Sequence, residues 1–136
     1  TRLSHDEQRT FVTLWCIFPS PLMVGGDLPR ADAWTTSLLT NPEVIAVDQH
    51  STGNHPVVTT DKAVVWVAES AKAGGHYLAI FNLEESTQTV RYSWKDLGWP
   101  AGKRNLRDLW EHKDLGSAEA VTVTLPPHGS VLYGVR

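Results

Sequence analysis

The acid that is best placed for chemistry is Asp27. It follows a short apolar run over residues 21–24 and two glycines, Gly25 and Gly26. An unbroken apolar run that ends in glycines is typical of a strand buried on both faces of a parallel sheet. Reactive side chains in such folds stand at the carboxyl ends of the strands, where these three residues fall. Asp27 is therefore a candidate site residue, and the alternative is an Asp that stabilises a turn or caps a helix.

A second carboxylate in a matching position is missing from the sequence. Hydrolysis of a glycosidic bond needs two carboxylates at a defined separation across that bond. The other notable acids are predicted to lie in a polar cluster or solvated strand edge around Trp110, or in a charged turn: Asp108, Glu111 and Asp114, and Glu84 with Glu85. Because no convincing pair is present, we predict no catalytic residue in the chain.

Motifs for metal, nucleophilic and phosphate chemistry are not found either. None of the six histidines has a partner two or four residues away: His5, His50, His55, His76, His112 and His128. Cys16 lies in an apolar stretch, and no Gly-x-Ser-x-Gly elbow or glycine-rich phosphate loop occurs. We therefore expect no metal site and no cofactor.

The six tryptophans offer another kind of site. Exposed tryptophan faces serve as stacking platforms in sugar-binding surfaces. Trp94 and Trp99 flank a turn over residues 95–98 and are the candidates for such stacking. The alternative is burial, because large aromatic area dominates core energetics. Trp15 and Trp66 lie in apolar runs, so we expect them in the core.

Composition excludes several classes of partner. The chain has 136 residues, 41% of them hydrophobic, and a net charge of −3, which is ordinary for one globular domain. No basic stripe with interleaved aromatics supports nucleic-acid binding. The most apolar stretch, residues 11–26, is too short for a membrane span and contains two prolines. One cysteine leaves the compartment open.

The first part of the chain reads as helix, strand and helix. Ser4 and Glu7 form a capping box that starts a helix ending near Phe18. The second half of this helix is apolar nearly all round, which predicts burial on most sides. The apolar run over residues 21–24 then predicts the strand, residues 31–40 a second helix, and residues 43–47 one further turn. This order is typical of an α/β barrel or a doubly wound sheet, but the piece is too small to close a barrel or cover a sheet, and we expect a longer parent chain.

The later part of the chain has β character. Residues 48–56 are rich in turn formers and predict a linker. Six short runs follow, and two of them alternate apolar and polar residues clearly: 63–67, 77–81, 87–94, 106–110, 121–125 and 131–135. Such spacing is typical of an antiparallel sandwich or barrel. We therefore predict two domains, residues 1–52 and residues 57–136.

Several segments resemble a known enzyme family. The segments FVTLWCIFPSPLMVGGDL (11–28) and LLTNPEVIAVDQ (38–49) resemble the end of the catalytic barrel of glycoside hydrolase family 27. This family contains α-galactosidases and relatives acting on α-N-acetylgalactosaminides and β-L-arabinopyranosides. The segments RDLWEHKDLG (107–116) and PHG (127–129) are similar to its C-terminal β-domain. The resemblance implies an α+β chain: the last helix, strand and helix of a (β/α)8 barrel, then a Greek-key β-sandwich.

The resemblance also implies what the chain lacks. Family members use a retaining mechanism with two aspartates, and both positions would lie upstream of Thr1. Asp27 matches an acid that supports the barrel rim, so Gly25, Gly26 and Asp27 are expected at the substrate rim and not as catalytic groups. The expected parent is an exo-acting hydrolase of terminal α-galactosides, and this chain alone should be inactive.

Two other roles stay open at this stage. The chain could be a stand-alone β-sandwich that binds carbohydrate, or a structural module. Packing through the exposed barrel helix, including a homo-oligomer, is a further expectation for partners.

Overall fold

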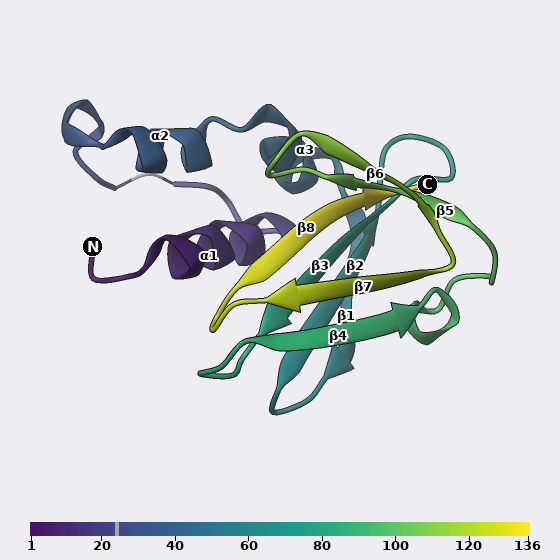
Figure 1. Cartoon of the computed structure of the whole chain (residues 1–136). Coiled ribbons are helices and arrows are strands. Elements are labelled where there is room, and N and C mark those ends of the chain that lie inside the picture. The colour runs from purple at the N-terminus through teal and green to yellow at the C-terminus, as the bar shows by residue number, and fades with distance from the viewer. Residues whose placement is uncertain (24) are drawn as a thin grey trace.

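A computed structural model describes residues 1–23 and 25–136. Within these residues the helices come first and the strands follow (Figure 1). The helices are α1 (His5–Ile17), η1 (Leu28–Arg30), α2 (Ala33–Leu39), α3 (Pro42–His50) and η2 (Lys95–Leu97). The strands are β1 (Thr52–Thr59), β2 (Ala63–Glu69), β3 (His76–Asn82), β4 (Gln88–Ser93), β5 (Arg104–Asp108), β6 (Lys113–Ala118), β7 (Ala120–Leu125) and β8 (Ser130–Val135).

Helix starts are set by side-chain caps. Ser4 accepts a hydrogen bond from the Glu7 amide, and the Glu7 carboxylate accepts one from the Ser4 amide, so the predicted capping box is confirmed. Asp32 caps α2 through the Thr35 amide. The Asn41 side chain accepts hydrogen bonds from two amides at the start of α3. This helix runs to His50 and is therefore longer than the single turn predicted from the sequence.

The strands form an antiparallel sandwich, as predicted. One sheet has the order β1-β2-β3-β8-β5-β6, and β4 pairs with β7 in a second, two-stranded sheet. Strands far apart in the sequence are neighbours, since β3 pairs with β8 and β8 with β5, as in Greek-key connections. Figure 1 shows α1 and α3 on one side of the large sheet, with β4 and β7 on the other.

The central strand β3 is buried on both faces along residues 78–81, which is why these four residues are all apolar. Leu78 and Ile80 point into the core between the two sheets, together with the fully buried Trp94. Ala79 and Phe81 alternate with them and point into the core beneath the helices. Burial of each large aliphatic side chain contributes about 1.5–3 kcal/mol, so both layers depend on this strand.

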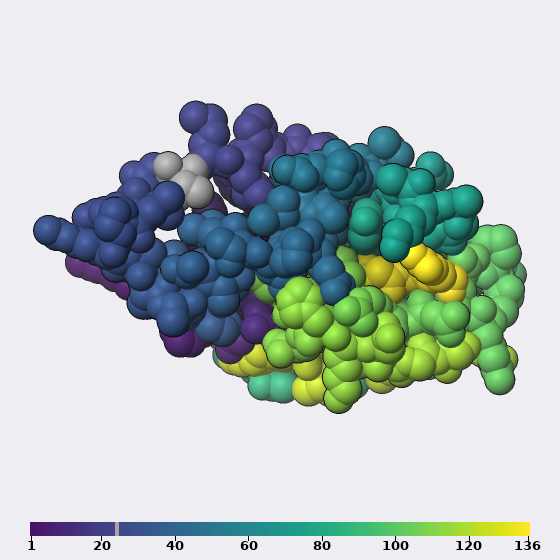
Figure 2. All heavy atoms as spheres, turned by 90° about the horizontal axis from the view of Figure 1, so that it is seen from above, coloured from purple at the N-terminus to yellow at the C-terminus, as the bar shows by residue number. Residues whose placement is uncertain are grey.

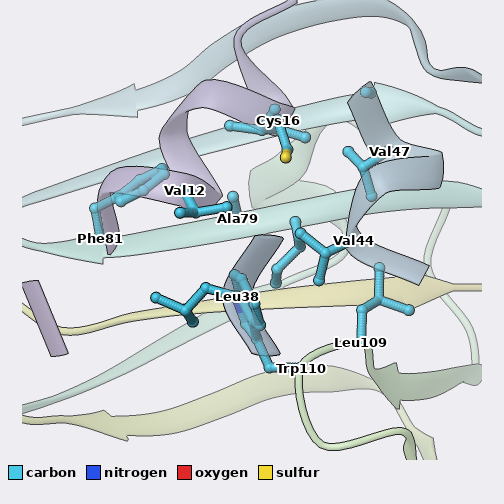
Figure 3. Packing of buried hydrophobic residues seen from close by; sticks show 12 residues of the cluster. Val12, Cys16, Leu38, Val44, Val47, Ala79, Phe81, Leu109 and Trp110 are labelled. Carbon is cyan, nitrogen blue, oxygen red and sulfur yellow. The ribbon is translucent and has the colours of Figure 1, made fainter. Parts of the chain in front are cut away.

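The core beneath the helices joins the two parts of the chain. Figure 3 shows Val12 and Cys16 of α1 and Val44 of α3 around Ala79 of β3, with Trp110 from the loop after β5 nearby. The Cys16 thiol is fully buried, and burial, with a smaller effect from Asp48, raises its pKa to about 12. It therefore stays protonated and acts as a small apolar side chain.

One face of α1 is apolar and exposed, which corrects the expectation of burial on most sides. Phe11 is 54% exposed, Leu14 and Trp15 are 38% exposed, and Phe18 is 49% exposed. Trp15 is therefore not a core residue, whereas Trp66 is partly buried and packs against the core beneath the helices. Figure 2 shows the purple and blue helical segments from one end of an elongated molecule to its middle, where the blue residues meet the green and yellow strands. The helix has one packed layer beneath it, so its second apolar side meets solvent.

The predicted strand over residues 21–24 is not formed in residues 21–23, which are exposed and unpaired with any described strand, and Val24 lies outside the described residues. A buried parallel strand needs neighbours on both sides. The predicted linker over residues 48–56 is also wrong, because α3 runs into β1 there. The division into residues 1–52 and 57–136 stays a prediction.

Candidate functional site

The three predicted rim residues lie together in an exposed turn. Gly25, Gly26 and Asp27 precede η1, and Asp27 stands at its N-cap without making a side-chain cap. The Asp27 Oδ2 atom lies 3.3 Å from Arg30 Nε, and both side chains are exposed. A Cβ atom at Gly25 or Gly26 would meet no other atom within 4 Å. The turn as it stands does not require glycine at either position for space.

This turn forms one wall of a hollow of about 500 Å³. Leu3, which precedes α1, and Phe11 in the middle of α1 line it on one side, and α2 supplies Leu38 and Leu39. Among the described residues, Asp27 is the one carboxylate that lines the hollow. A two-carboxylate reaction therefore has no second acid in this hollow.

Trp94 is not a sugar platform. Its side chain is fully buried between the sheets, and its indole Nε1 donates a hydrogen bond to the Ala118 carbonyl oxygen at 2.9 Å. The prediction of an exposed stacking face at Trp94 was wrong because the turn over residues 95–98 folds into η2 and turns the ring inward. Its alternative, burial, is confirmed.

Trp99 is half-buried, and its ring is already occupied. The His76 ring stacks on it with centroids 4.6 Å apart, and the Arg104 guanidinium carbon lies 5.6 Å from the ring centroid. Burial, with a smaller effect from Arg104, lowers the pKa of His76, which favours the neutral ring in this stack. A sugar would have to displace these neighbours, so the structure gives no support to stacking at Trp99.

A second hollow of about 790 Å³ lies where α3 meets the large sheet. Glu43 of α3 and Arg107 of β5 stand in its lining and bind each other with two hydrogen bonds, of 2.7 and 2.9 Å. Arg107 also binds Asp114 at 2.9 Å, and His112 Nδ1 lies 2.9 Å from Glu43 Oε1. Of the three acids predicted around Trp110, Asp114 alone joins this group. Asp108 accepts from the amides of Trp110 and Glu111 instead, and Glu111 pairs with Arg9, so the predicted cluster of three acids is not formed.

The electrostatics of Glu43 exclude acid catalysis by this group. The hydrogen bonds from Arg107, aided by His112, lower the pKa of Glu43 to about 2. The same contacts raise the pKa of Arg107. A carboxylate with so low a pKa stays ionised near neutrality and holds no proton to donate. One signal in the sequence pointed to this pair: Arg107 lies in the segment 107–116 that resembles the family's β-domain. Nothing in the sequence indicated its partner.

Four further contacts connect the helices to the loop after β5. The Asn41 side chain, besides capping α3, donates to the Leu109 carbonyl oxygen at 3.1 Å. Trp110 Nε1 donates to the Thr13 hydroxyl on α1 at 2.9 Å. Arg9 of α1 lies over the Trp110 ring, 5.5 Å from its centroid, and pairs with Glu111 at 2.9 Å. The loop after β5 therefore serves as a docking element for the helices.

Neither a metal centre nor a membrane span is found in the described part of the chain. No three His, Cys, Asp or Glu side chains there are grouped so that they could hold a metal ion. No helix of residues 1–23 and 25–136 is both long and apolar enough to cross a membrane.

Comparison with known proteins accounts for this combination of parts. Residues 60–135 match the family model described as the alpha galactosidase C-terminal beta sandwich domain, and residues 1–50 match the model described as alpha galactosidase A. The chain belongs to the glycoside hydrolase family 27 α-galactosidases and corresponds to the end of their catalytic domain followed by the C-terminal β-sandwich.

The related enzymes are much longer than the segment that this chain matches. The chain is 33% identical to the α-galactosidase of Coffea arabica and 32% identical to that of Cyamopsis tetragonoloba. Each match covers 96% of this chain but 35% and 33% of those enzymes. The chain therefore spans about a third of the length of the curated relatives it matches.

In the solved structures, too, this chain matches about a third of the enzyme. A family 27 β-L-arabinopyranosidase from Geobacillus stearothermophilus is 44% identical and superposes with a TM-score of 0.94, over 99% of this chain and 31% of that enzyme. A variant of that enzyme has been solved in complex with arabinose. The α-galactosidase I of Mortierella vinacea, 24% identical with a TM-score of 0.90, shares the fold.

Proposed function

We propose that this chain is the C-terminal part of a retaining, exo-acting glycoside hydrolase that removes terminal α-galactosyl units. Both catalytic aspartates lie outside these 136 residues, and the chain by itself is inactive. Gly25, Gly26 and Asp27 contribute to the rim of the sugar site once the catalytic barrel is complete. Carbohydrate is the ligand of the whole enzyme.

The observation that carries this proposal is the exposed apolar face of α1. Phe11, Leu14, Trp15 and Phe18 lie along this face, and each is at least 38% exposed. The opposite face of the same helix is buried against the sandwich through Val12 and Ile17. A helix that is apolar on both sides is suited to burial between two layers, and a large exposed apolar patch marks a surface that normally has a partner. The rest of the barrel is the partner that the family match supplies.

The sandwich has a supporting role in this proposal. Its two candidate sugar-stacking residues are occupied, since Trp94 is buried and Trp99 is covered by His76 and Arg104. Its contacts to the helices, by contrast, include the charged pair of Arg107 with Glu43 and the buried bond of Trp110 with Thr13. These contacts favour a module that holds the last barrel helices in place over one that binds carbohydrate independently.

The experiment joins this chain to the upstream two-thirds of the family 27 enzyme from Geobacillus, with the relative's own segment as a reference. Aryl α-galactoside and aryl β-L-arabinopyranoside are both assayed, because relatives of both kinds match this chain. We expect the hybrid to hydrolyse one of the two and Trp15→Glu to reduce the yield of active enzyme strongly. Thr122→Glu, at an exposed position of β7, is the matched control and should leave the yield unchanged. A hybrid that tolerates Trp15→Glu as well as Thr122→Glu would contradict the proposal.

A further inference from the structure

Three elements of the structure meet at His128. This residue lies in the turn between β7 and β8 and has a left-handed backbone, with φ of 54°. Its carbonyl oxygen accepts a hydrogen bond from the Thr10 hydroxyl of α1 at 2.7 Å. Its amide donates to the carbonyl oxygen of Glu84, in the loop after β3, at 3.3 Å. The backbone of His128 is thus fixed by α1 on one side and by the loop after β3 on the other, independently of its side chain.

The imidazole ring lies between two carboxylates. Nδ1 lies 3.0 Å from Glu7 Oε1, and Nε2 lies 3.1 Å from Glu85 Oε1. An ionised carboxylate can only accept hydrogen bonds, and a neutral imidazole carries one N–H group. In the neutral ring, one of these contacts would set a nitrogen lone pair against a carboxylate oxygen. Both contacts are favourable only when both nitrogens carry a proton.

Glu7 is itself fixed to the start of α1. Its other oxygen, Oε2, accepts the Ser4 amide at 2.8 Å as part of the capping box. One carboxylate therefore caps the helix and binds the sandwich at once. The titratable groups that face the ring are Glu7 from α1 and Glu85 from the loop after β3, and the neighbouring groups from Thr10 and Ser130 are hydroxyls.

We propose that protonated His128 is a proton-controlled clasp that fastens α1, and with it the end of the catalytic domain, to the β-sandwich. The clasp consists of His128, Glu7 and Glu85. It closes when the ring carries both protons and loosens when the ring loses one. It concerns contacts within this chain and does not depend on the proposed enzymatic activity.

The pH range of the clasp follows from the charges around it. The hydrogen bond to Glu7, followed by the charge of Glu85, raises the pKa of His128 above its ordinary value of 6.5. The Ser4 amide, followed by His128, lowers the pKa of Glu7. A raised histidine pKa gives stability that is complete below the unfolded-state pKa and is lost as the pH rises through the folded-state pKa. The clasp is therefore closed in mildly acidic solution and open in alkaline solution.

The test combines an NMR titration of the histidines with amide hydrogen exchange of α1 in the 136-residue chain. We expect His128 to titrate above 6.5. From pH 5.5 to pH 8.5, after correction for the intrinsic exchange rate, the opening constant of the α1 amides should rise about two- to fivefold, the range typical of solvent-accessible ion pairs.

Matched variants separate the clasp from general effects of pH. His128→Asn keeps a residue that tolerates a left-handed backbone and should remove the pH dependence of α1 opening, whereas His55→Asn should retain it. Glu7→Gln keeps a capping side chain and should move the His128 pKa back toward 6.5. A His128 pKa at or below 6.5 in the unmodified chain, or an unchanged pH dependence in His128→Asn, would overturn the proposal.

Discussion

Arg107 on β5 donates two hydrogen bonds to Glu43 on α3, 64 residues away in the sequence, at distances of 2.7 and 2.9 Å. The pair connects the last helix to the large sheet, next to the Asn41 contact with Leu109. It is partly solvent-accessible, with side-chain exposures of 37% and 29%. A bidentate pair of this kind fixes orientation as well as supplying attraction, so it sets the angle at which α3 lies on the sheet.

The first prediction concerns acid stability. The pKa of Glu43 is lowered to about 2, so its contribution to stability is complete above the unfolded-state value near 4.5 and is lost as the pH falls through the folded-state value. Glu43→Gln should therefore flatten the decline in unfolding midpoint between pH 4.5 and pH 2. Urea unfolding followed by tryptophan fluorescence measures this. Glu119→Gln, an exposed acid between β6 and β7, is the control and should keep the slope of the unmodified chain.

The second prediction concerns the buried bond between Trp110 and Thr13. Thr13→Val keeps the shape of the side chain but leaves the indole N–H without an acceptor, which costs about 1–3 kcal/mol of unfolding free energy. Thr122→Val replaces an exposed threonine on β7 and should change the free energy by less than about 0.5 kcal/mol. Equal unfolding free energies for the two variants would show that the bond at 2.9 Å contributes nothing.

The third prediction concerns the two kinds of glycine in the chain. A Cβ atom at Gly129 would lie 2.6 Å from Cγ of Pro126, so Gly129→Ala must distort the turn that carries His128. Overpacking of this kind costs about 1–3 kcal/mol. Gly26→Ala meets nothing within 4 Å and should be neutral for stability. Thermal unfolding distinguishes them, and a Gly129→Ala protein as stable as Gly26→Ala would contradict the geometry of the turn.

Helix caps and strands with clear apolar alternation could be predicted from the sequence because their causes are local. The Ser4 and Glu7 capping box and the alternation over residues 121–125 each need no distant partner to be recognised. The two edge strands of the large sheet, β1 and β6, were missed. β1 contains Gly53, Asn54 and Pro56, and pairs on one side alone, with β2. Proline and turn-forming residues are tolerated at an edge, where half of the backbone groups need no partner strand.

The other edge strand, β6, was missed for the same reason, and its sequence contains fewer strand signals than that of β1. It pairs with β5 at the other edge of the sheet, and five of its six residues are exposed. No apolar alternation marks such a strand. The opposite error occurred at residues 21–23, where an apolar run suggested a strand that no described neighbour pairs with. Whether an apolar segment becomes a strand depends on the backbone beside it, which a local pattern does not contain.

The site was the least predictable part. Trp99 carries the right residue type for sugar binding, yet its ring is covered by His76 and Arg104, from two separate strands. The partners of Glu43 and His128 lie 64 and 121 residues away. Contacts of this range depend on the register of the folded sheet, so the sequence could indicate candidate groups but not their pairing.

The most direct test of the central claim is a hydrolysis assay of the 136-residue chain alone, on aryl α-galactoside and aryl β-L-arabinopyranoside. We expect no turnover above the uncatalysed rate with either substrate, because among the described residues Asp27 is the one carboxylate that lines its hollow. Hydrolysis by the pure chain that disappears in Asp27→Asn would contradict it, since the reacting acids would then lie within these residues.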